Sequence, residues 1–184
     1  TYANSVAYWR VYDAHFAKSD PYPEVKLLGL ATLPSYHLYT VKKPVKAVAD
    51  LEGMKIRATG TTLTDMLAAL GAEAVPANVT ELHDVLSKGI VDGMVGNDDQ
   101  VRSFGIAKYF DYKTEIPGGL TTLSTFFCIN KDKWAQISAE DQAAILATVG
   151  ERHAEDIGRA MDKSVILGPA ELEKETVEVL VADQ

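Results

Sequence analysis

Arg57 is the side chain whose type and position most clearly predict chemistry. It lies near the carboxyl end of a strand predicted over 54–58 and just before Gly60, where a helix is predicted to begin. In open α/β sheets, ligands bind beyond the carboxyl ends of strands, and a guanidinium matches a carboxylate with two parallel hydrogen bonds. We therefore predict that Arg57 binds an anion. The alternative is a solvated salt bridge in a chain rich in acidic residues.

The other chemically distinctive residues form no catalytic or metal-binding pattern. The run Gly60-Thr61-Thr62 precedes a predicted helix and can receive an anion at its amides, but it lacks the lysine of a phosphate-binding loop, so helix capping is the simpler interpretation. Cys128 lies in an apolar run and is interpreted as a small buried hydrophobic residue. The histidines are scattered, at His15, His37, His83 and His153. We predict no enzyme activity, no metal and no cofactor.

Composition narrows the classes of partner. The 184 residues include 18 Lys and Arg against 26 Asp and Glu, for a formal charge of −8. A protein that binds a phosphate backbone needs a basic face, so no nucleic-acid partner is predicted. No apolar run approaches the ~18 residues of a membrane span, so the chain is predicted not to be embedded in a membrane. At 47% hydrophobic residues it can bury the core of one domain or of two small lobes.

Strand and helix patterns alternate along the chain, which predicts an α/β fold with a largely parallel sheet. The chain opens inside an amphipathic helical pattern over 3–19, with Tyr8, Val11, Tyr12, His15 and Phe16 near one face, so we expect it to be a fragment of a longer fold. The longest helical pattern begins at Ser138 and continues beyond Met161, and Gly168-Pro169 is expected to interrupt it. The alternation at 177–181 predicts an edge strand.

Several runs, in order, carry a resemblance to a known family. The run over 49–57, ADLEGMKIR, resembles the DLKGxKIR signature of TRAP-transporter substrate-binding proteins of the DctP type. Leu70-Gly71-Ala72, Val75-Pro76, the leucine-rich stretch from Glu81 and the run Gly89-Ile90-Val91-Asp92-Gly93 match the segments that follow it in the family. Further on, the run over 129–134, INKDKW, and the segment over 138–145 resemble the family's NKdkW segment. Together these runs cover nearly the whole chain.

The resemblance implies a two-lobed periplasmic-binding-protein-like (Venus flytrap) fold, with most of the N-terminal part of the first lobe absent. We expect 1–33 to be the retained part of lobe I, 34–120 to be lobe II, 121–161 to return to lobe I, and 162–184 to lie on lobe II. The implied function is that of an extracytoplasmic receptor of a tripartite ATP-independent (TRAP) transporter. Such a receptor binds a small organic acid between its lobes and delivers it to the membrane subunits. A periplasmic location is implied, with a signal peptide in the parent sequence.

Site residues are carried over one at a time. The carboxylate-binding arginine of the family falls on Arg57. A ligand-binding asparagine of many members is displaced by one residue here, so Asn97 is either a ligand contact or a helix cap. His37 lies near the position of a second arginine in members that bind acidic sugars, which argues against such a ligand. Further candidates for the pocket, each against packing or capping as the alternative, are Phe127 on the strand that crosses between lobes, and Tyr36 and Thr80 beside predicted loops.

Two other functions stay open at this point. A ligand-sensing effector domain of a transcriptional regulator shares the two-lobed α/β plan. An α/β enzyme would use His37 and Asp residues as acid–base groups, but no assembled catalytic constellation is present in the sequence. The acid itself is also open among a C4-dicarboxylate, a keto acid, a sugar acid and an aromatic acid.

Overall fold

A computed structural model describes residues 1–182, so the last two residues of the tail predicted over 162–184 lie outside the described part. The chain divides into two compact units. Unit 1 consists of residues 1–34 and 122–164, and unit 2 consists of residues 35–121 and 165 onward. The α/β fold class predicted from the sequence is confirmed.

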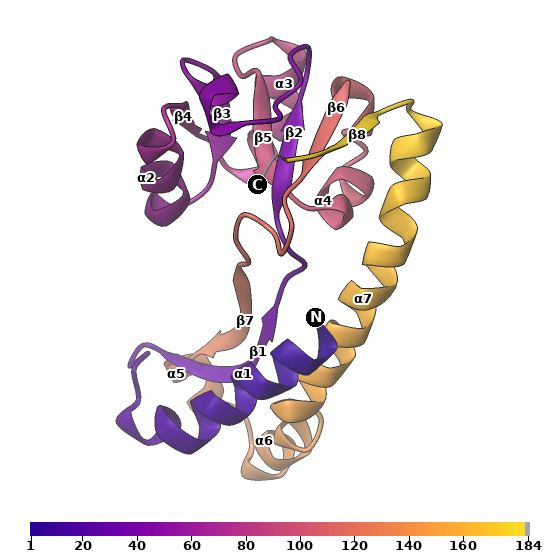
Figure 1. The fold of residues 1–184 in the computed structure, drawn as a ribbon. Coiled ribbons are helices and arrows are strands. Elements are labelled where there is room, and N and C mark those ends of the chain that lie inside the picture. The colour runs from indigo at the N-terminus through magenta and orange to yellow at the C-terminus, as the bar shows by residue number, and fades with distance from the viewer. Residues whose placement is uncertain (183–184) are drawn as a thin grey trace. The chain divides into compact units, whose positions relative to one another are not determined.

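Unit 2 is built on a six-stranded sheet in the order β4-β3-β5-β2-β6-β8 (Figure 1). Its strands are β2 (His37–Thr40), β3 (Lys55–Ala58), β4 (Glu73–Pro76), β5 (Gly93–Gly96), β6 (Tyr112–Glu115) and β8 (Glu178–Val181). Its helices and turns are η2 (Val48–Leu51), α2 (Thr61–Ala69), η3 (Val79–Glu81), α3 (Leu82–Ser87), α4 (Asp98–Ser103) and η4 (Ala107–Tyr109). The edge position of β8 agrees with the alternation of apolar residues in that segment.

The sheet is largely parallel, as predicted, and β2 is the strand that runs against the other five described strands. Helix α2 joins β3 to β4, and α3 leads from β4 to β5; β3 pairs in parallel with both of these strands, as helical crossovers favour. Strand β2 pairs antiparallel with β5 and with β6. Alternation of strands and helices predicted the crossovers, but it carries no information about the direction in which β2 enters the sheet.

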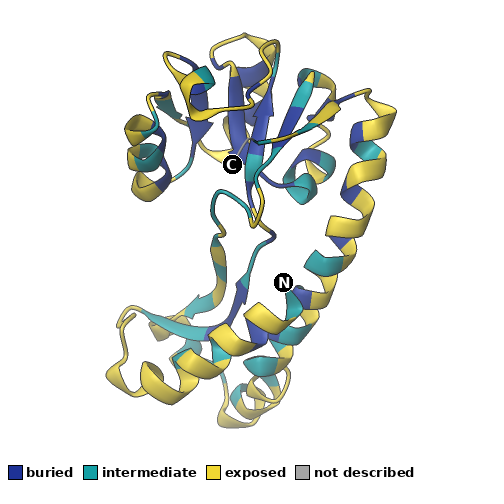
Figure 2. Ribbon diagram, in the orientation of Figure 1, coloured by how far each residue is buried: buried dark blue, intermediate teal, exposed yellow. Residues whose placement is uncertain are grey.

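The core of unit 2 lies against this sheet, and Figure 2 shows the central strands as mostly buried and α4 as mostly intermediate. Apolar side chains at helical spacing on α3 and α4 meet side chains of β2 and β5, which is the packing expected of amphipathic helices on a sheet. The core cluster comprises Tyr39, Leu82, Val85, Leu86, Val91, Met94, Val101, Ile106, Ala107, Phe110, Leu172 and Val177.

Unit 1 has a two-stranded antiparallel sheet with helices packed on it. Strand β1 pairs with β7 from Val25 opposite Asn130 to Thr32 opposite Ser124. The elements of unit 1 are α1 (Tyr2–His15), η1 (Ala17–Ser19), β1 (Val25–Thr32), β7 (Ser124–Asn130), α5 (Lys131–Ala135) and α6 (Ala139–Leu146). Helix α7 (Glu151–Lys174) contributes residues to both units.

Helix α1 buries a different face from the predicted one. Its buried residues are Ser5 and Val6, whereas Val11 and Phe16 are about half exposed. The reason is a close contact at its first turn, where the amide of Thr32 on β1 donates to Ser5 Oγ at 3.0 Å.

The long C-terminal helical pattern also differs from the expectation. It is divided at Gly150, whose φ of +73° ends the connection between α6 and α7, because glycine adopts this left-handed conformation without steric cost. Gly168 and Pro169, expected to break the helix, lie inside α7. A Cβ on Gly168 would lie 2.2 Å from Asp98 Cβ, so this glycine allows a close approach of α7 to α4 within unit 2.

Candidate functional site

In unit 2, the ends of several strands lie at one edge of the sheet. Strands β3, β4 and β5 run in parallel, so Arg57, Ala77 and Asn97 all lie at or just beyond their carboxyl ends. Strand β2 is antiparallel to β5, with His37 opposite Gly96, so the residue before β2 lies at the same edge. The predicted location of a ligand site in an open α/β sheet is this edge.

Arg57 is the largest fully buried side chain of unit 2, with 1% of its surface exposed. Its Nε donates to the carbonyl oxygen of Ala77 at 2.9 Å, which fixes the plane of the guanidinium. Its Nη1 and Nη2 atoms are buried and have no hydrogen-bond partner among residues 1–182. Among the described residues, no hydrogen-bond acceptor therefore pairs with the two nitrogen atoms that a guanidinium uses to bind a carboxylate.

The pKa of the Arg57 guanidinium reflects its burial. Burial lowers the pKa of its guanidinium, and attraction to Tyr36 and Glu81 opposes that shift only in part. The guanidinium stays protonated all the same, because its ordinary pKa is so high. The carboxylate of Glu81 is engaged elsewhere, since its Oε2 accepts from the amide of Asn78 at 2.7 Å. A buried ion without a partner destabilises a fold by several kcal/mol, and an anionic ligand would remove that penalty.

Tyr36 and Gln100 complete a polar cluster with Arg57. Tyr36 is 1% exposed and forms an isolated bridge with Thr121 before β2 begins. Gln100 Nε2 donates to the Tyr36 hydroxyl at 3.1 Å. Burial raises the pKa of that hydroxyl, while the charge of Arg57 lowers it, and the net shift is upward. Tyr36 is therefore neutral near pH 7 and keeps a proton to donate.

Gln100 was not singled out from the sequence, although one signal points to its place. It stands three residues after Asn97, the spacing at which a glutamine follows the first residue of a capping box. Asn97 caps α4, because its Oδ1 accepts from the amide of Gln100 at 2.9 Å. The cap thus fixes the backbone of Gln100 directly beyond β5 and aims its side chain at Tyr36. Of the two roles left open for Asn97, the structure shows the cap; a ligand contact stays a prediction.

His37 and Thr80 take different places in unit 2. His37 is half-buried, and its Nδ1 accepts from the amide of Ile116 at 3.2 Å. Burial and then the charge of Lys113 lower the pKa of His37, against the opposing effects of Glu115 and Asp98. Thr80 lies exposed on η3. Their roles toward a ligand remain predictions.

Phe127 belongs to unit 1, where it lies on β7 opposite Gly29 of β1. It is about half exposed and stacks on His153 of α7, with ring centroids 5.4 Å apart. A Cβ on Gly29 would lie 2.3 Å from the ring of His153, so the glycine makes room for this histidine beside Phe127. The structure thus gives Phe127 a packing partner, and its role as a ligand contact stays a prediction.

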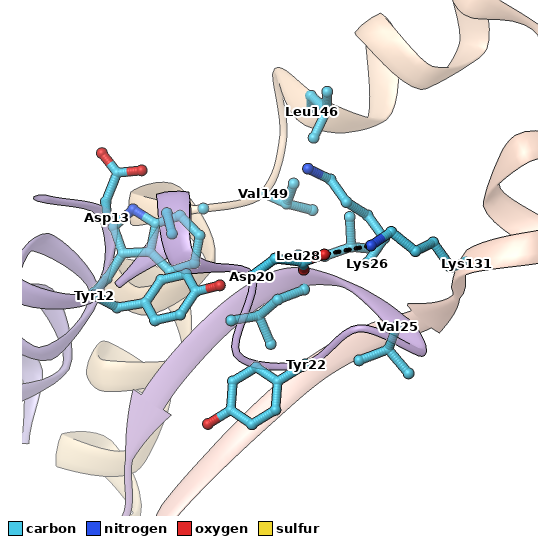
Figure 3. A pocket seen from close by; sticks show the side chains of 14 residues that line it. Tyr12, Asp13, Asp20, Tyr22, Val25, Lys26, Leu28, Lys131, Leu146 and Val149 are labelled. Atoms are coloured by element: carbon cyan, nitrogen blue, oxygen red, sulfur yellow. Dashed lines mark hydrogen bonds and ion pairs between the residues drawn. The ribbon is translucent and has the colours of Figure 1, made fainter. Parts of the chain in front are cut away.

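A cavity of about 460 Å³ lies in unit 1 among α1, β1 and the segment before α7 (Figure 3). Trp9, Tyr12 and Tyr22 contribute aromatic surface to it. Its charged groups include Asp20 and Lys131, which pair with each other at 2.6 Å. This cavity therefore differs from the Arg57 edge, where a deeply buried cation has two donor atoms without a protein partner.

No group of three or more potential metal-ligating side chains converges within residues 1–182. The helices of that range also lack the combination of length and apolar character needed to cross a membrane. The polar atoms that the site offers are the Nη1 and Nη2 donors of the Arg57 guanidinium, the hydroxyl of Tyr36 and the amide oxygen of Gln100. This set can bind a small polar anion.

Comparison with known proteins identifies the family. The profile described as "Bacterial extracellular solute-binding protein, family 7" (DctP) matches residues 10–180. The chain belongs to this family. This match confirms the family resemblance of the sequence motifs.

Two curated proteins and two solved structures illustrate the relationship of this DctP-family chain to its relatives. It is 33% identical over 153 residues to the "Outer membrane transporter protein TsaT" of Comamonas testosteroni, covering 83% of this chain and 45% of that protein. It is 27% identical over 145 residues to a solute-binding protein of Chromohalobacter salexigens, covering 74% and 42%. The chain thus spans less than half the length of these curated relatives.

Among solved structures, a TRAP periplasmic solute-binding protein of Bordetella bronchiseptica with bound (R)- and (S)-mandelate has 32% identity and a TM-score of 0.90 over the whole of this chain and 58% of its own. A marine-metagenome TRAP solute-binding protein specific for aromatic acids, in complex with 3-hydroxybenzoate, has 29% identity and a TM-score of 0.89, covering 100% and 57%. The fold of this DctP-family chain is therefore that of the periplasmic binding proteins. Neither the regulator nor the enzyme alternative is favoured by these comparisons.

Proposed function

We propose that this chain is the ligand-binding part of an extracytoplasmic solute receptor of a TRAP transporter, and that it holds a small organic acid by its carboxylate at Arg57. The observation that carries the proposal is the burial of a guanidinium whose Nη1 and Nη2 have no partner among the described residues. A carboxylate supplies two acceptor atoms in the plane of that fork.

An aromatic monocarboxylate is the proposed ligand class. The Bordetella bronchiseptica protein, at 32% identity, holds mandelate, and two structures of the metagenome protein, at 28% and 29% identity, hold metahydroxyphenylacetate and 3-hydroxybenzoate. The cluster of unit 2 contains one cation, Arg57, which suits one carboxylate better than two. Burial and the nearby Lys113 disfavour the charged form of His37, so His37 adds no second cation for a dicarboxylate at neutral pH.

Periplasmic location and the membrane subunits of the transporter as partners belong to the same proposal. They rest on the family assignment, since TRAP solute-binding proteins work with membrane subunits. The receptor is proposed to capture its ligand without converting it, because binding energy here comes from fixed hydrogen bonds rather than from an assembled acid–base pair.

Native mass spectrometry of the full-length protein, purified from the periplasm of its host, tests the proposal. We expect a co-purified mass that matches an organic acid, and isothermal titration with mandelate and 3-hydroxybenzoate giving saturable binding with unchanged ligand recovered afterward. A protein that carries no acid and binds none of a panel of aromatic acids, dicarboxylates and sugar acids would refute it. Consumption of the acid over time would indicate an enzyme.

A further inference from the structure

Gln100 carries another buried polar atom that has no partner among the described residues of unit 2. Its Nε2 is used, because it donates to the Tyr36 hydroxyl at 3.1 Å. Its Oε1 is buried and has no hydrogen-bond partner within residues 1–182. An amide oxygen only accepts hydrogen bonds, so the missing partner must be a donor.

The unpartnered oxygen and the unpartnered guanidinium belong to one cluster. Arg57 pairs with Met94 in the sheet, and Met94 Cε and Gln100 Oε1 both lie against Gly96. Gln100 in turn donates to the Tyr36 hydroxyl. The cluster therefore has two kinds of buried group without a partner among the described residues. Arg57 Nη1 and Nη2 are donors that an anionic acceptor would pair with, and Gln100 Oε1 is an acceptor that an O–H or N–H group would pair with. A carboxylate without a further donor group pairs with the guanidinium and leaves Oε1 without a partner.

The local backbone holds the Gln100 amide in this position. The Asn97 cap fixes the first turn of α4, and Gly96 leaves the space that the amide needs. A Cβ on Gly96 would lie 2.8 Å from Gln100 Oε1 and 2.6 Å from Met94 Cε. A glycine at this point of β5 thus allows a side-chain oxygen to lie against the strand.

We propose that Gln100 is a specificity-determining residue that accepts a hydrogen bond from a hydroxyl group of the acid held at Arg57, so that the receptor selects hydroxy acids over the matched acids without the hydroxyl. This inference rests on the proposed function. A site built to hydrogen-bond a hydroxyl rejects the analogue that lacks it, because its own buried group is then left unpaired. The expected discrimination is roughly 10- to 100-fold in Kd.

Matched acids test the proposal in isothermal titrations of the full-length receptor. Mandelate is compared with phenylacetate, which lacks the hydroxyl, and with benzoylformate, which replaces it by an accepting carbonyl; 3-hydroxybenzoate is compared with benzoate. We expect the hydroxy acid to bind about 10- to 100-fold more tightly in at least one pair, and benzoylformate to bind no better than phenylacetate. Equal affinities in both pairs, or a preference for benzoylformate over mandelate, would overturn the proposal.

Variants then assign the discrimination to Gln100. In Gln100→Met, which keeps the length of the side chain, the hydroxy acid should fall to the affinity of its partner while the acid without the hydroxyl changes little. Gln100→Asn, which withdraws the amide by one methylene, should reduce the same ratio. The control Gln136→Met, at an exposed amide of unit 1, should leave the ratio at the wild-type value. A ratio that survives both Gln100 variants overturns the assignment.

The two proposals fail in distinguishable ways. If no acid binds the wild-type receptor, the proposed function itself is refuted. If acids bind, and Arg57→Met abolishes their binding while the hydroxyl makes no difference, the carboxylate site stands and the role of Gln100 is refuted. The wild-type pair measurements decide this second question even if a Gln100 variant does not fold.

Discussion

Replacing Arg57 by methionine should change binding and stability in opposite directions. Arg57→Met keeps most of the volume of the side chain and removes the buried charge. Losing a buried charge-assisted pair with a carboxylate costs about 2–5 kcal/mol of binding free energy, which corresponds to roughly 30- to 5,000-fold in Kd. Titration with the tightest-binding acid measures this loss.

The ligand-free variant should be no less stable than the wild type. Removing a buried ion whose Nη1 and Nη2 have no partner among the described residues gains about 1–4 kcal/mol when an apolar side chain fills the space. Loss of the bond from Nε to Ala77 subtracts about 1 kcal/mol. We therefore expect an unfolding free energy between unchanged and about 3 kcal/mol higher, read from urea denaturation without ligand.

An exposed arginine provides the matched control. Arg10 pairs with Glu151 on the surface of unit 1, at 2.6 Å, and Arg10→Met should leave acid binding unchanged. Acid affinity that survives Arg57→Met would refute the carboxylate assignment. A marked loss of stability in the ligand-free variant would show that Arg57 is satisfied within the protein, and would remove the physical reason for placing an anion beside it.

Three further predictions concern the polar groups of unit 2. Tyr36→Phe removes the hydroxyl beside the guanidinium and should weaken acid binding about fivefold, the equivalent of one neutral hydrogen bond, in the same titrations. Lys113→Met leaves the carboxylate of Asp98, 2.9 Å away in the wild type, with the Tyr39 hydroxyl but without its buried cation, and should cost about 3–5 kcal/mol in urea denaturation. The pKa of His37 is lowered in the folded state, so the unfolded chain binds a proton at this residue first, and the free energy of unfolding should fall as the pH drops below about 6.5. His37→Asn keeps an acceptor for the amide of Ile116 and should lose less stability than the wild type between pH 7.5 and 5.0. An equal loss in both proteins would contradict the role of this histidine.

The local elements of unit 2 follow closely from its sequence. Apolar and charged side chains alternate over 54–58, directly after Gly53, and this alternation predicts β3. Gly71 follows α2 and has a φ of +87°. Asn78 and Glu81 predict a helix start, and the Glu81 carboxylate accepts from the Asn78 amide there. These features were predictable because each depends on residues a few positions apart.

Features that depend on distant residues were not predictable in the same way. Gly168 looked like a helix breaker, but its lack of a Cβ serves the contact of α7 with Asp98. The direction of β2 depends on pairing with β5 and β6, which no local pattern specifies. In the candidate site, position in the sequence pointed to Arg57, whereas Gln100 became visible only when the structure showed its amide oxygen buried beside Tyr36 without a partner among the described residues.

A crystal structure of the full-length receptor with a bound aromatic acid tests the central claim most directly. The account predicts that the two carboxylate oxygens lie within hydrogen-bond distance, about 2.7–2.9 Å, of Arg57 Nη1 and Nη2, with Nε still bonded to Ala77. A carboxylate bound elsewhere, for example beside Lys26 in the cavity of unit 1, with the Arg57 guanidinium untouched, would contradict it.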